Sequence, residues 1–302
     1  VYPRTNEDQI REKEELQMSA MEAYREFIAS KQIYVKPFGF DVPRGLLNKS
    51  LFDWQARVVQ WALKRGRAAL FEDTGLGKTL QQLAWAEMVH NHTGQPVVIH
   101  TPVGVRHQTQ REAGKFAIDC KVEVVDDASS VIDGINLVNY EKLHKFDASI
   151  WGGVVLDESS VLKGMDGKTR KLLTESYVNT NYRLACTATP APNDISELAN
   201  HAEFLGAMSR AEMLASFFVH DADGSASVGG WRIKGYAEDE FWRWVSTWGC
   251  FIRKRVATDA PRRTRARAQK GSGSSEVPCA QASGLYPSQG RRVPAVHSRT
   301  SP

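Results

Sequence analysis

The sequence has few cysteines and no long apolar run. Its four cysteines, at positions 120, 186, 250 and 279, stand far apart and form no C-x-x-C pair. This argues against a structural zinc site and a disulfide framework, and it is typical of a reducing cytoplasm. No apolar stretch approaches the roughly 18 residues that span a membrane, and the first residues are too polar for a signal peptide. We therefore expect a cytoplasmic protein that does not associate with membranes.

The excess of positive charge is confined to the C-terminal end. The 302 residues carry a net charge of +4, but residues 255–302 contain nine Lys/Arg and two Asp/Glu, a balance of +7. Residues 1–254 therefore hold 30 basic and 33 acidic side chains, a balance of −3. The part of the chain with a folding pattern gives no general charge argument for nucleic-acid binding.

Residues 46–195 alternate short apolar runs with helical stretches. We predict strands over the runs rich in Val, Ile, Leu and Ala, at 68–72, 96–101, 121–125, 135–139, 153–158 and 182–189. Helical patterns lie between them, for example at 79–92 and 105–116. Strands that are apolar throughout and separated by helices are typical of a parallel sheet covered on both faces. The sequence therefore predicts an α/β fold, a three-layer α/β/α domain with a mainly parallel sheet.

Three segments flank this domain. Residues 1–45 are rich in good helix formers and are predicted to form a helical extension, unless they belong to an over-extended gene model. Residues 196–255 are predicted to form a helical insertion. Residues 256–302 lack large apolar side chains and are predicted to be disordered. This tail has two interpretations, a basic arm that binds nucleic acid or the out-of-frame or truncated end of a gene.

The predicted insertion has an unusual set of aromatic residues. They are Trp242, Trp244, Trp248 and Phe251. Such a set can stack on nucleic-acid bases or pack in a core. Because the spacing spreads these side chains around a helix, we favour core packing.

The stretch "FEDTGLGKT" at 71–79 is the clearest motif. It lies between a predicted strand and a predicted helix, where backbone N–H groups and a helix N-terminus together bind phosphate. The residues expected to wrap the β-phosphate are Thr74, Gly75, Leu76, Gly77 and Lys78. Lys78 is also expected to neutralise the β- and γ-phosphates, and the Thr79 hydroxyl to bind Mg²⁺. Glu72 stands where the general G-x-x-x-x-G-K-[ST] pattern has its first glycine.

A second motif, "VVLDES", begins at Val154 and ends a predicted buried strand in two carboxylates. Parallel strands place their carboxyl ends at one edge of a sheet, so Asp157 and Glu158 are expected beside the phosphate loop. We predict that Asp157 holds Mg²⁺ through water and that Glu158 polarises the attacking water. The two motifs together indicate a P-loop NTPase that uses Mg²⁺.

With three further stretches the chain resembles the superfamily-two helicases and translocases, specifically the Swi/Snf-like branch. These stretches are "LFDWQARVVQWAL", "VVIHTP" and "LACTATPAPND", and the resemblance covers roughly residues 45–255. The loop of that family reads D-x-G-x-G-K-T without a leading glycine, so Glu72 no longer speaks against a phosphate loop. "RLACTATPAPND" and "NHAEFLG" are similar to helicase-like proteins of phages and prophages, which implies the cytoplasm of a bacterial host.

The resemblance implies roles for residues outside the loop. Gln55 is expected to read adenine, and Thr101 and Pro102 are expected to contact a nucleic-acid backbone, as are residues 136–146. The family's motif that couples phosphate state to strand movement corresponds to Thr187, Thr189, Pro190 and Asn193. The acidic motif reads "DESS", whose two serines depart from the common DEAD and DEAH forms.

The resemblance also implies two RecA-like lobes, the second of which donates arginine fingers to the γ-phosphate. "FIRKR" at 251–255 resembles the block that closes the first lobe, so Arg253, Lys254 and Arg255 are expected to lie away from the nucleotide. We recognise no second lobe after this block. We therefore expect a RecA-like ATP-binding lobe of a helicase-like ATPase that works on double-stranded DNA and turns over slowly without a second lobe. Further candidate partners are phage replication proteins.

Two other interpretations remain open. The first is another P-loop enzyme, such as a nucleotide kinase, which neither Gln55 nor the Thr-Ala-Thr-Pro strand end favours. The second is a non-catalytic remnant that binds nucleotide and nucleic acid.

Overall fold

The computed structural model describes residues 37–164, 167–220 and 230–254, together with scattered positions between 10 and 26. The scattered positions are helical. The predicted tail at 256–302 lies outside the described residues, as does most of the predicted N-terminal extension.

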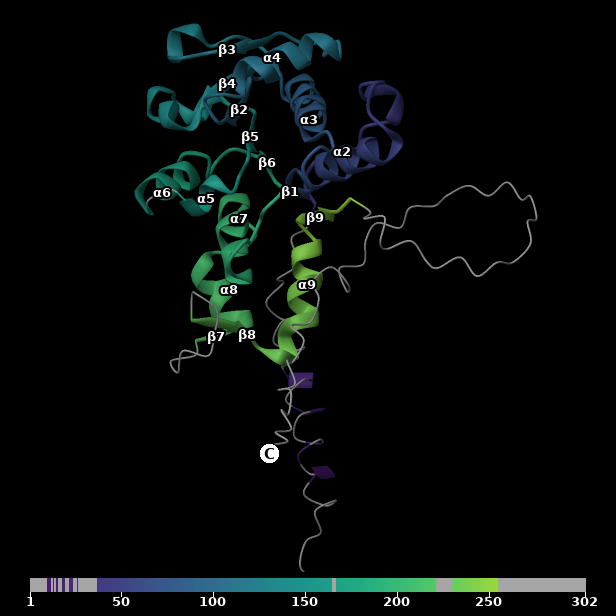
Figure 1. Ribbon diagram of the computed structural model, residues 1–302, viewed down its shortest axis with the longest axis vertical. Helices are drawn as coiled ribbons and strands as arrows, with labels where there is room; N and C mark the ends of the chain where they lie inside the picture. Colours follow the sequence, from purple (N-terminus) through teal and green to yellow (C-terminus); the bar gives the residue numbers. More distant parts are fainter. Residues whose placement is uncertain are drawn as a thin grey trace, which may run out of the picture.

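A seven-stranded sheet forms the middle of the molecule (Figure 1). Its strands, in spatial order, are β3 (Val122–Val124), β4 (Ile135–Asn139), β2 (Val97–Thr101), β5 (Gly153–Asp157), β6 (Tyr182–Thr187), β1 (Arg67–Glu72) and β9 (Gly249–Ile252). Every neighbouring pair is parallel. This confirms the predicted α/β class and places the carboxyl ends of all seven strands at one edge.

Helices cover both faces of this sheet. The longer helices of the described residues are α2 (Asp53–Arg65), α3 (Lys78–Thr93), α4 (Arg106–Lys115), α6 (Gly167–Ser176), α7 (Leu198–Leu205), α8 (Arg210–Phe217) and α9 (Glu238–Ser246). The shorter ones are α5 (Val161–Gly164) and the 3₁₀ turns η1 (Arg44–Leu46), η2 (Ala128–Ser130), η3 (Tyr140–Lys145), η4 (Ala148–Ile150), η5 (Ile195–Glu197) and η6 (Gly235–Ala237).

Two apolar cores separate the three layers, as the alternation of side chains along a strand requires. In β1, Ala68 and Leu70 join the core beneath α2, α3 and α4. Ala69 and Phe71 join the other core, beneath α5 to α9. Both faces of β1 are therefore buried, which explains why the strand is apolar throughout and confirms the predicted three layers.

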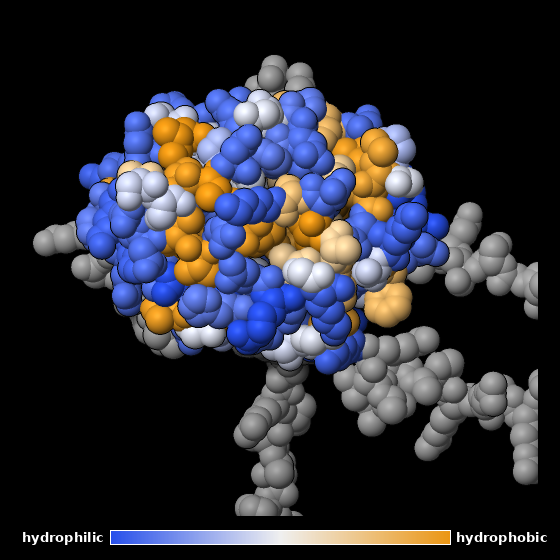
Figure 2. Space-filling model, turned by 90° about the horizontal axis from the view of Figure 1, so that it is seen from above, coloured by the Kyte–Doolittle hydropathy of each residue, from blue (hydrophilic) through white to orange (hydrophobic). Residues whose placement is uncertain are grey.

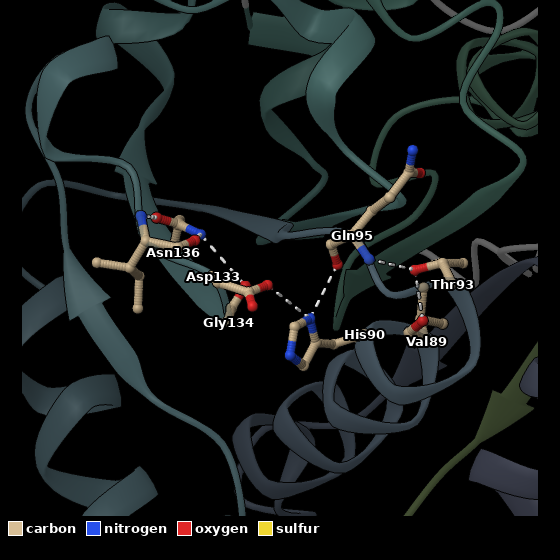
Figure 3. Close-up of polar contacts among 8 residues, drawn as sticks. Val89, His90, Thr93, Gln95, Asp133, Gly134 and Asn136 are labelled. Carbon is tan, nitrogen blue, oxygen red and sulfur yellow. Dashed lines mark hydrogen bonds and ion pairs between the residues drawn. The ribbon is translucent and has the colours of Figure 1, made fainter.

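The turn after α3 delivers the chain directly into β2. The helix stops at Gly94, whose φ of 64° is a left-handed conformation that glycine adopts readily. Figure 3 shows the polar contacts of this turn: the Thr93 hydroxyl donates to the Val89 carbonyl oxygen at 2.8 Å, and the Gln95 N–H donates to the Thr93 hydroxyl. His90 Nδ1 lies 2.9 Å from the Gln95 carbonyl oxygen. These bonds stabilise the turn at the amino end of β2, which lies at the opposite edge of the sheet from the motifs.

The segment after residue 195 differs from the predicted helical insertion. It contains a two-stranded antiparallel sheet, β7 (Phe218–His220) and β8 (Trp231–Ile233), as well as β9 of the main sheet. The prediction of a helical insertion over 196–255 is wrong at its C-terminal end, because α9 stops at Ser246 and β9 then pairs with β1. β9 supplies partners to N–H groups at the edge of β1: Ala69 donates to the Trp248 carbonyl at 2.7 Å.

The aromatic set of this segment packs in the core, as predicted. Trp244 and Trp248 are fully buried, with ring centroids 5.3 Å apart. Trp242 and Phe251 are partly buried and pack against the same core. These four side chains are therefore not a base-stacking surface.

The surface at the α4 and β3 end of the molecule is mostly hydrophilic, with apolar residues between the polar ones (Figure 2). α4 contributes to this surface, because only Thr109 and Ala113 of its ten residues are buried. Among the described residues, no helix is both long enough and apolar enough to cross a lipid bilayer.

Candidate nucleotide-binding site

The parallel sheet brings the predicted motifs to one edge. The glycine loop follows β1, the two carboxylates end β5, and the Thr-Ala-Thr-Pro stretch ends β6. β1, β6 and β5 are adjacent in the sheet. The structure therefore gathers the residues expected to bind phosphate, metal and water.

Two glycines give the loop its shape. Gly75 and Gly77 have φ values of 74° and 80°, in the left-handed region where a side chain is strained. Gly77 caps the 16-residue helix α3, whose N-terminus carries unsatisfied N–H groups and a partial positive charge. This geometry fits the predicted phosphate cradle.

Lys78 lies across the loop. Its ammonium group donates to the carbonyl oxygens of Glu72 at 2.7 Å and of Asp73 at 3.1 Å. The ammonium group therefore lies at the start of the phosphate loop, where phosphate is expected to bind.

Gln55 has a structural partner that the sequence did not indicate. Its side chain is 4 % exposed, accepts the Phe52 N–H at 2.9 Å and donates to the Leu76 carbonyl oxygen at 2.8 Å. A Cβ added at Gly77 would lie 2.5 Å from Gln55 Nε2. Gln55 therefore ties the start of α2 to the phosphate loop. One amide hydrogen and one lone pair are left over, so its predicted contact with adenine stays a prediction.

Asp157 is held in place by two residues that the motifs did not include. Gln82 of α3 donates to Asp157 Oδ1 at 2.8 Å, and the Tyr140 hydroxyl donates to its backbone carbonyl at 2.7 Å. Burial raises the pKa of the Asp157 carboxyl group. Gln82 lies one helical turn after Thr79, so the two expected metal ligands are joined through α3.

The donor set fits Mg²⁺ better than a transition metal. The described residues contain no cluster of three His, Cys, Asp or Glu side chains able to hold a metal ion. Magnesium in nucleotide sites is usually bound by one or two protein oxygens, with phosphate and water completing its shell. Thr79 and Asp157, the predicted ligands, would supply two such oxygens.

Glu158 is tied to the end of β6. Its Oε1 accepts hydrogen bonds from the Thr187 and Ser160 hydroxyls, both at 2.6 Å. The Thr187 hydroxyl in turn accepts the Thr189 N–H at 3.1 Å. The backbone of Glu158 has a φ of 57°, which is uncommon for a residue with a side chain. The predicted water-polarising carboxylate and the predicted coupling motif are therefore in direct contact.

The two serines of the "DESS" motif have separate tasks. Ser160 binds Glu158, as described above. Ser159 is buried, and its hydroxyl lies 3.0 Å from Nε2 of His201 on α7. Its N–H donates to the Cys186 carbonyl oxygen at 2.7 Å. The serine at position 159 thus attaches the turn after β5 to α7, whereas the bond to β6 is made by the backbone and does not depend on the side chain.

The other coupling residues lie on the loop after β6. Thr189 and Asn193 are exposed, whereas Pro190 is buried. The Asn193 side-chain amide donates to Glu197 at 2.9 Å, which folds the loop back onto η5.

Glu72 is a buried acid at the start of the loop. Its side chain is 0 % exposed, and its Oε2 accepts a hydrogen bond from Gln81 at 2.8 Å. Burial raises its pKa to about 7, while Gln81 and Lys78 oppose the shift. Sequence reasoning treated this position only as a departure from a pattern.

Lys254 lies at the phosphate loop, against expectation. Its N–H donates to Asp73 Oδ2 at 2.8 Å, and its ammonium nitrogen lies 2.9 Å from where a Cβ of Gly75 would be. The prediction that this basic block lies away from the nucleotide site is therefore wrong for Lys254. The cause is that β9 runs parallel to β1 and ends at the same edge. Arg255 lies outside the described residues.

The predicted nucleic-acid residues end β2 at the same edge of the sheet. Thr101 is 0 % exposed, whereas Pro102 is half-buried. Nearby basic groups share one acid: Arg106 Nη1 and Lys142 Nζ lie 2.7 Å and 2.5 Å from Asp126 Oδ1. The hydrogen bonds from Lys142 and Arg106 lower the pKa of Asp126. A phosphate backbone would compete with this carboxylate for the two cations.

A phosphate loop, a carboxylate pair and a RecA-like parallel sheet together define a P-loop ATPase lobe. Residues 54–218 match the family model of the SNF2-related domain. This match spans more than half of the chain, and the chain belongs to that family.

Two curated plant proteins illustrate the relationship. The chain is 25 % identical over 220 residues to the DNA excision repair protein CSB of Oryza sativa subsp. japonica, a match that covers 55 % of this chain and 18 % of the rice protein. It is 33 % identical over 96 residues to Protein CHROMATIN REMODELING 8 of Arabidopsis thaliana, covering 30 % and 8 % of the two chains. This chain therefore spans less than a fifth of the length of either relative.

Two solved structures share the fold. One is the Sulfolobus solfataricus SWI2/SNF2 ATPase core in complex with dsDNA, with a TM-score of 0.58, 22 % identity, and coverage of 72 % of this chain and 47 % of that one. The other is the Sulfolobus solfataricus SWI2/SNF2 ATPase core domain, with a TM-score of 0.56, 24 % identity, and coverage of 74 % and 49 %. This chain corresponds to about half of each.

Proposed function

We propose that this chain is the ATP-binding lobe of an SNF2-family translocase, which couples ATP binding and hydrolysis to movement on double-stranded DNA. The observation that carries the proposal is the chain of hydrogen bonds from Glu158 through Thr187 to Thr189. It joins the carboxylate next to the expected attacking water to an exposed loop on the sheet edge. A change at the γ-phosphate that moves Glu158 would thus shift that loop through these hydrogen bonds.

The proposed division of labour follows from the geometry. The N–H groups of the loop and the start of α3 bind the phosphates, and Lys78 leaves the carbonyls of residues 72 and 73 to neutralise them. Bound Mg²⁺ supplies neutralisation of the developing phosphate charge. Thr79 and Asp157 hold that ion, and Gln82 orients Asp157. Glu158 accepts a hydrogen bond from the attacking water and orients it.

Rapid turnover is proposed to depend on a second RecA-like lobe. The described residues form one such lobe, and an arginine donated from outside it would stabilise the transition-state charge. In related phosphoryl-transfer systems such a group contributes about 10³–10⁵ in rate. The second lobe can come from the same protein or from another chain.

The proposed DNA surface is the edge formed by the ends of β2 and β4. Pro102, Arg106 and Lys142 lie there, and the Sulfolobus core that shares this fold was solved in complex with dsDNA. Binding through phosphate contacts would be largely independent of sequence and would weaken steeply with salt.

The test is to join a second SNF2-family lobe to the chain and to measure ATP hydrolysis with and without double-stranded DNA. Turnover that rises with DNA and is lost in Glu158→Gln supports the proposal. As a matched control, Glu203→Gln removes one carboxylate from α7, a helix without any of the proposed site residues, and should leave turnover unchanged. ATP hydrolysis that is insensitive to DNA in a fusion that binds both ligands would contradict the proposal.

A further inference from the structure

The last described strand attaches itself to the phosphate loop. The Asp73 N–H donates to the Ile252 carbonyl oxygen at 3.1 Å, which extends the β1–β9 ladder into the first residue of the loop. Two residues later the Lys254 N–H donates to the Asp73 carboxylate at 2.8 Å. These two bonds fix the backbone of Lys254 beside the loop, so its position does not depend on the flexible side chain alone.

The ammonium group of Lys254 then lies over Gly75. Its nitrogen would be 2.9 Å from a Cβ at that position, and Gly75 has the left-handed φ of 74°. The backbone conformation favours glycine there, whereas the flexible lysine side chain could move away from a Cβ. The absence of a side chain leaves the loop backbone open to both the lysine and a ligand.

The charge on Lys254 has no counterion in the described part of the chain. No carboxylate lies within ion-pair distance of its ammonium group there, and Asp73 is engaged by the backbone N–H instead. Lys78, in contrast, is hydrogen-bonded to two loop carbonyls. An unpaired cation placed beside N–H groups and a helix N-terminus adds to a site that already favours an anion.

We propose that Lys254 is a second phosphate-binding lysine of the nucleotide site, which contacts the phosphate chain of ATP from β9 while Lys78 contacts it from α3. The inference rests on the proposed function and deepens it. It also gives the C-terminal end of this lobe a direct link to the nucleotide.

The experiment is an equilibrium titration of the full 302-residue chain with a fluorescent ATP analogue. Lys254→Met is expected to weaken binding about ten- to hundredfold, the range for losing a hydrogen bond to a charged group. Lys254→Arg, which keeps the charge, should bind within twofold of the original chain. Arg253→Gln is the matched control, because it removes one positive charge from the neighbouring exposed position and should also stay within twofold.

The fold of each variant is checked by its melting temperature, and Lys254→Gln serves as a second neutral variant if Lys254→Met melts early. The Lys254 assignment is overturned if both neutral variants bind ATP as the original chain does, or if Arg253→Gln weakens binding equally. In the first case the original chain still binds ATP, so the proposed function stands. If the original chain itself binds no ATP, both the inference and the proposed function fail.

Discussion

The Thr187 hydroxyl donates a hydrogen bond of 2.6 Å to the Glu158 carboxylate and so joins the ends of β5 and β6. Thr187 is fully buried, and its oxygen also accepts the Thr189 N–H. A single hydroxyl is thus both donor to the expected water-polarising acid and acceptor from the loop that follows β6. The ends of β5 and β6 are therefore linked by hydrogen bonds that share this one oxygen atom.

The first prediction follows from this pair. Thr187→Val keeps the shape of the side chain but removes both hydrogen bonds of the hydroxyl, the one donated to Glu158 and the one accepted from the Thr189 N–H. We expect the free energy of unfolding to fall by about 1–3 kcal/mol, measured by urea denaturation. Thr187→Ser keeps the hydroxyl and should lose less. Equal free energies of unfolding for Thr187→Val and the original chain would show that the hydrogen bonds of this hydroxyl do not stabilise the fold.

The second prediction concerns the phosphate loop. Lys78→Ala should abolish ATP binding without unfolding the chain, because the lysine is half-buried and its hydrogen bonds are to two loop carbonyls. The control is Lys64→Ala, which removes a lysine of α2 that pairs with Asp41 at the surface. Titration with ATP and a thermal melt of both variants give the result. ATP affinity of Lys78→Ala within twofold of the original chain would rule out the assignment of this loop.

The third prediction is a pH dependence of stability from Glu72. Burial raises its pKa in the folded state from 4.5 to about 7. The folded chain therefore binds this proton more tightly than the unfolded chain, and stability decreases as pH rises from about 4.5 to about 7. A shift of this size corresponds to at most about 3 kcal/mol.

Glu72→Gln should remove this part of the pH dependence while keeping an acceptor for Gln81. Urea denaturation of both chains at pH 5 and pH 8 provides the comparison. We expect the variant to gain stability relative to the original chain at pH 8 and to show little difference at pH 5. A difference between the two chains that is the same at both pH values would mean that Glu72 does not titrate in this window.

The fourth prediction concerns the acid that holds Arg106 and Lys142. Asp126→Asn should release both cations for phosphate contacts and tighten binding of double-stranded DNA about three- to tenfold at low salt, with a steeper salt dependence. The matched control is Asp133→Asn, which changes an exposed acid just before β4, at the far edge of the sheet, near His90 (Figure 3). Fluorescence anisotropy with a labelled duplex measures both. Weaker DNA binding by Asp126→Asn would show that the acid organises this surface instead of blocking it.

The sequence predicted the central strands and the motif loops because their signals are local. β1, β2, β4, β5 and β6 are buried on both faces and read as apolar runs, and each motif stands directly after such a run. The phosphate loop adds a backbone constraint, since Gly75 and Gly77 need a left-handed conformation that favours their residue type. The roles of the site residues toward nucleotide and DNA stay predictions.

Other features depended on contacts that no local pattern records. β9 is four residues long and directly follows a helix, so its apolar run could not be distinguished from a continuing helix. The position of Lys254 follows from that pairing and was missed with it. The bond from Gln82 to the Asp157 carboxylate and the bond from the Tyr140 hydroxyl to the Asp157 backbone carbonyl join different elements, and only the folded chain reveals them.

The most direct test of the account measures ATP binding and ATP hydrolysis on the same sample of the 302-residue chain, with and without double-stranded DNA. The account predicts saturable binding of Mg²⁺-ATP that depends on Lys78. It also predicts turnover roughly a thousandfold or more below that of the fusion, because the described residues form one lobe and the fusion adds an arginine that stabilises the transferred phosphoryl group. A chain that binds no ATP, or one that hydrolyses it rapidly by itself in response to DNA, would contradict the account.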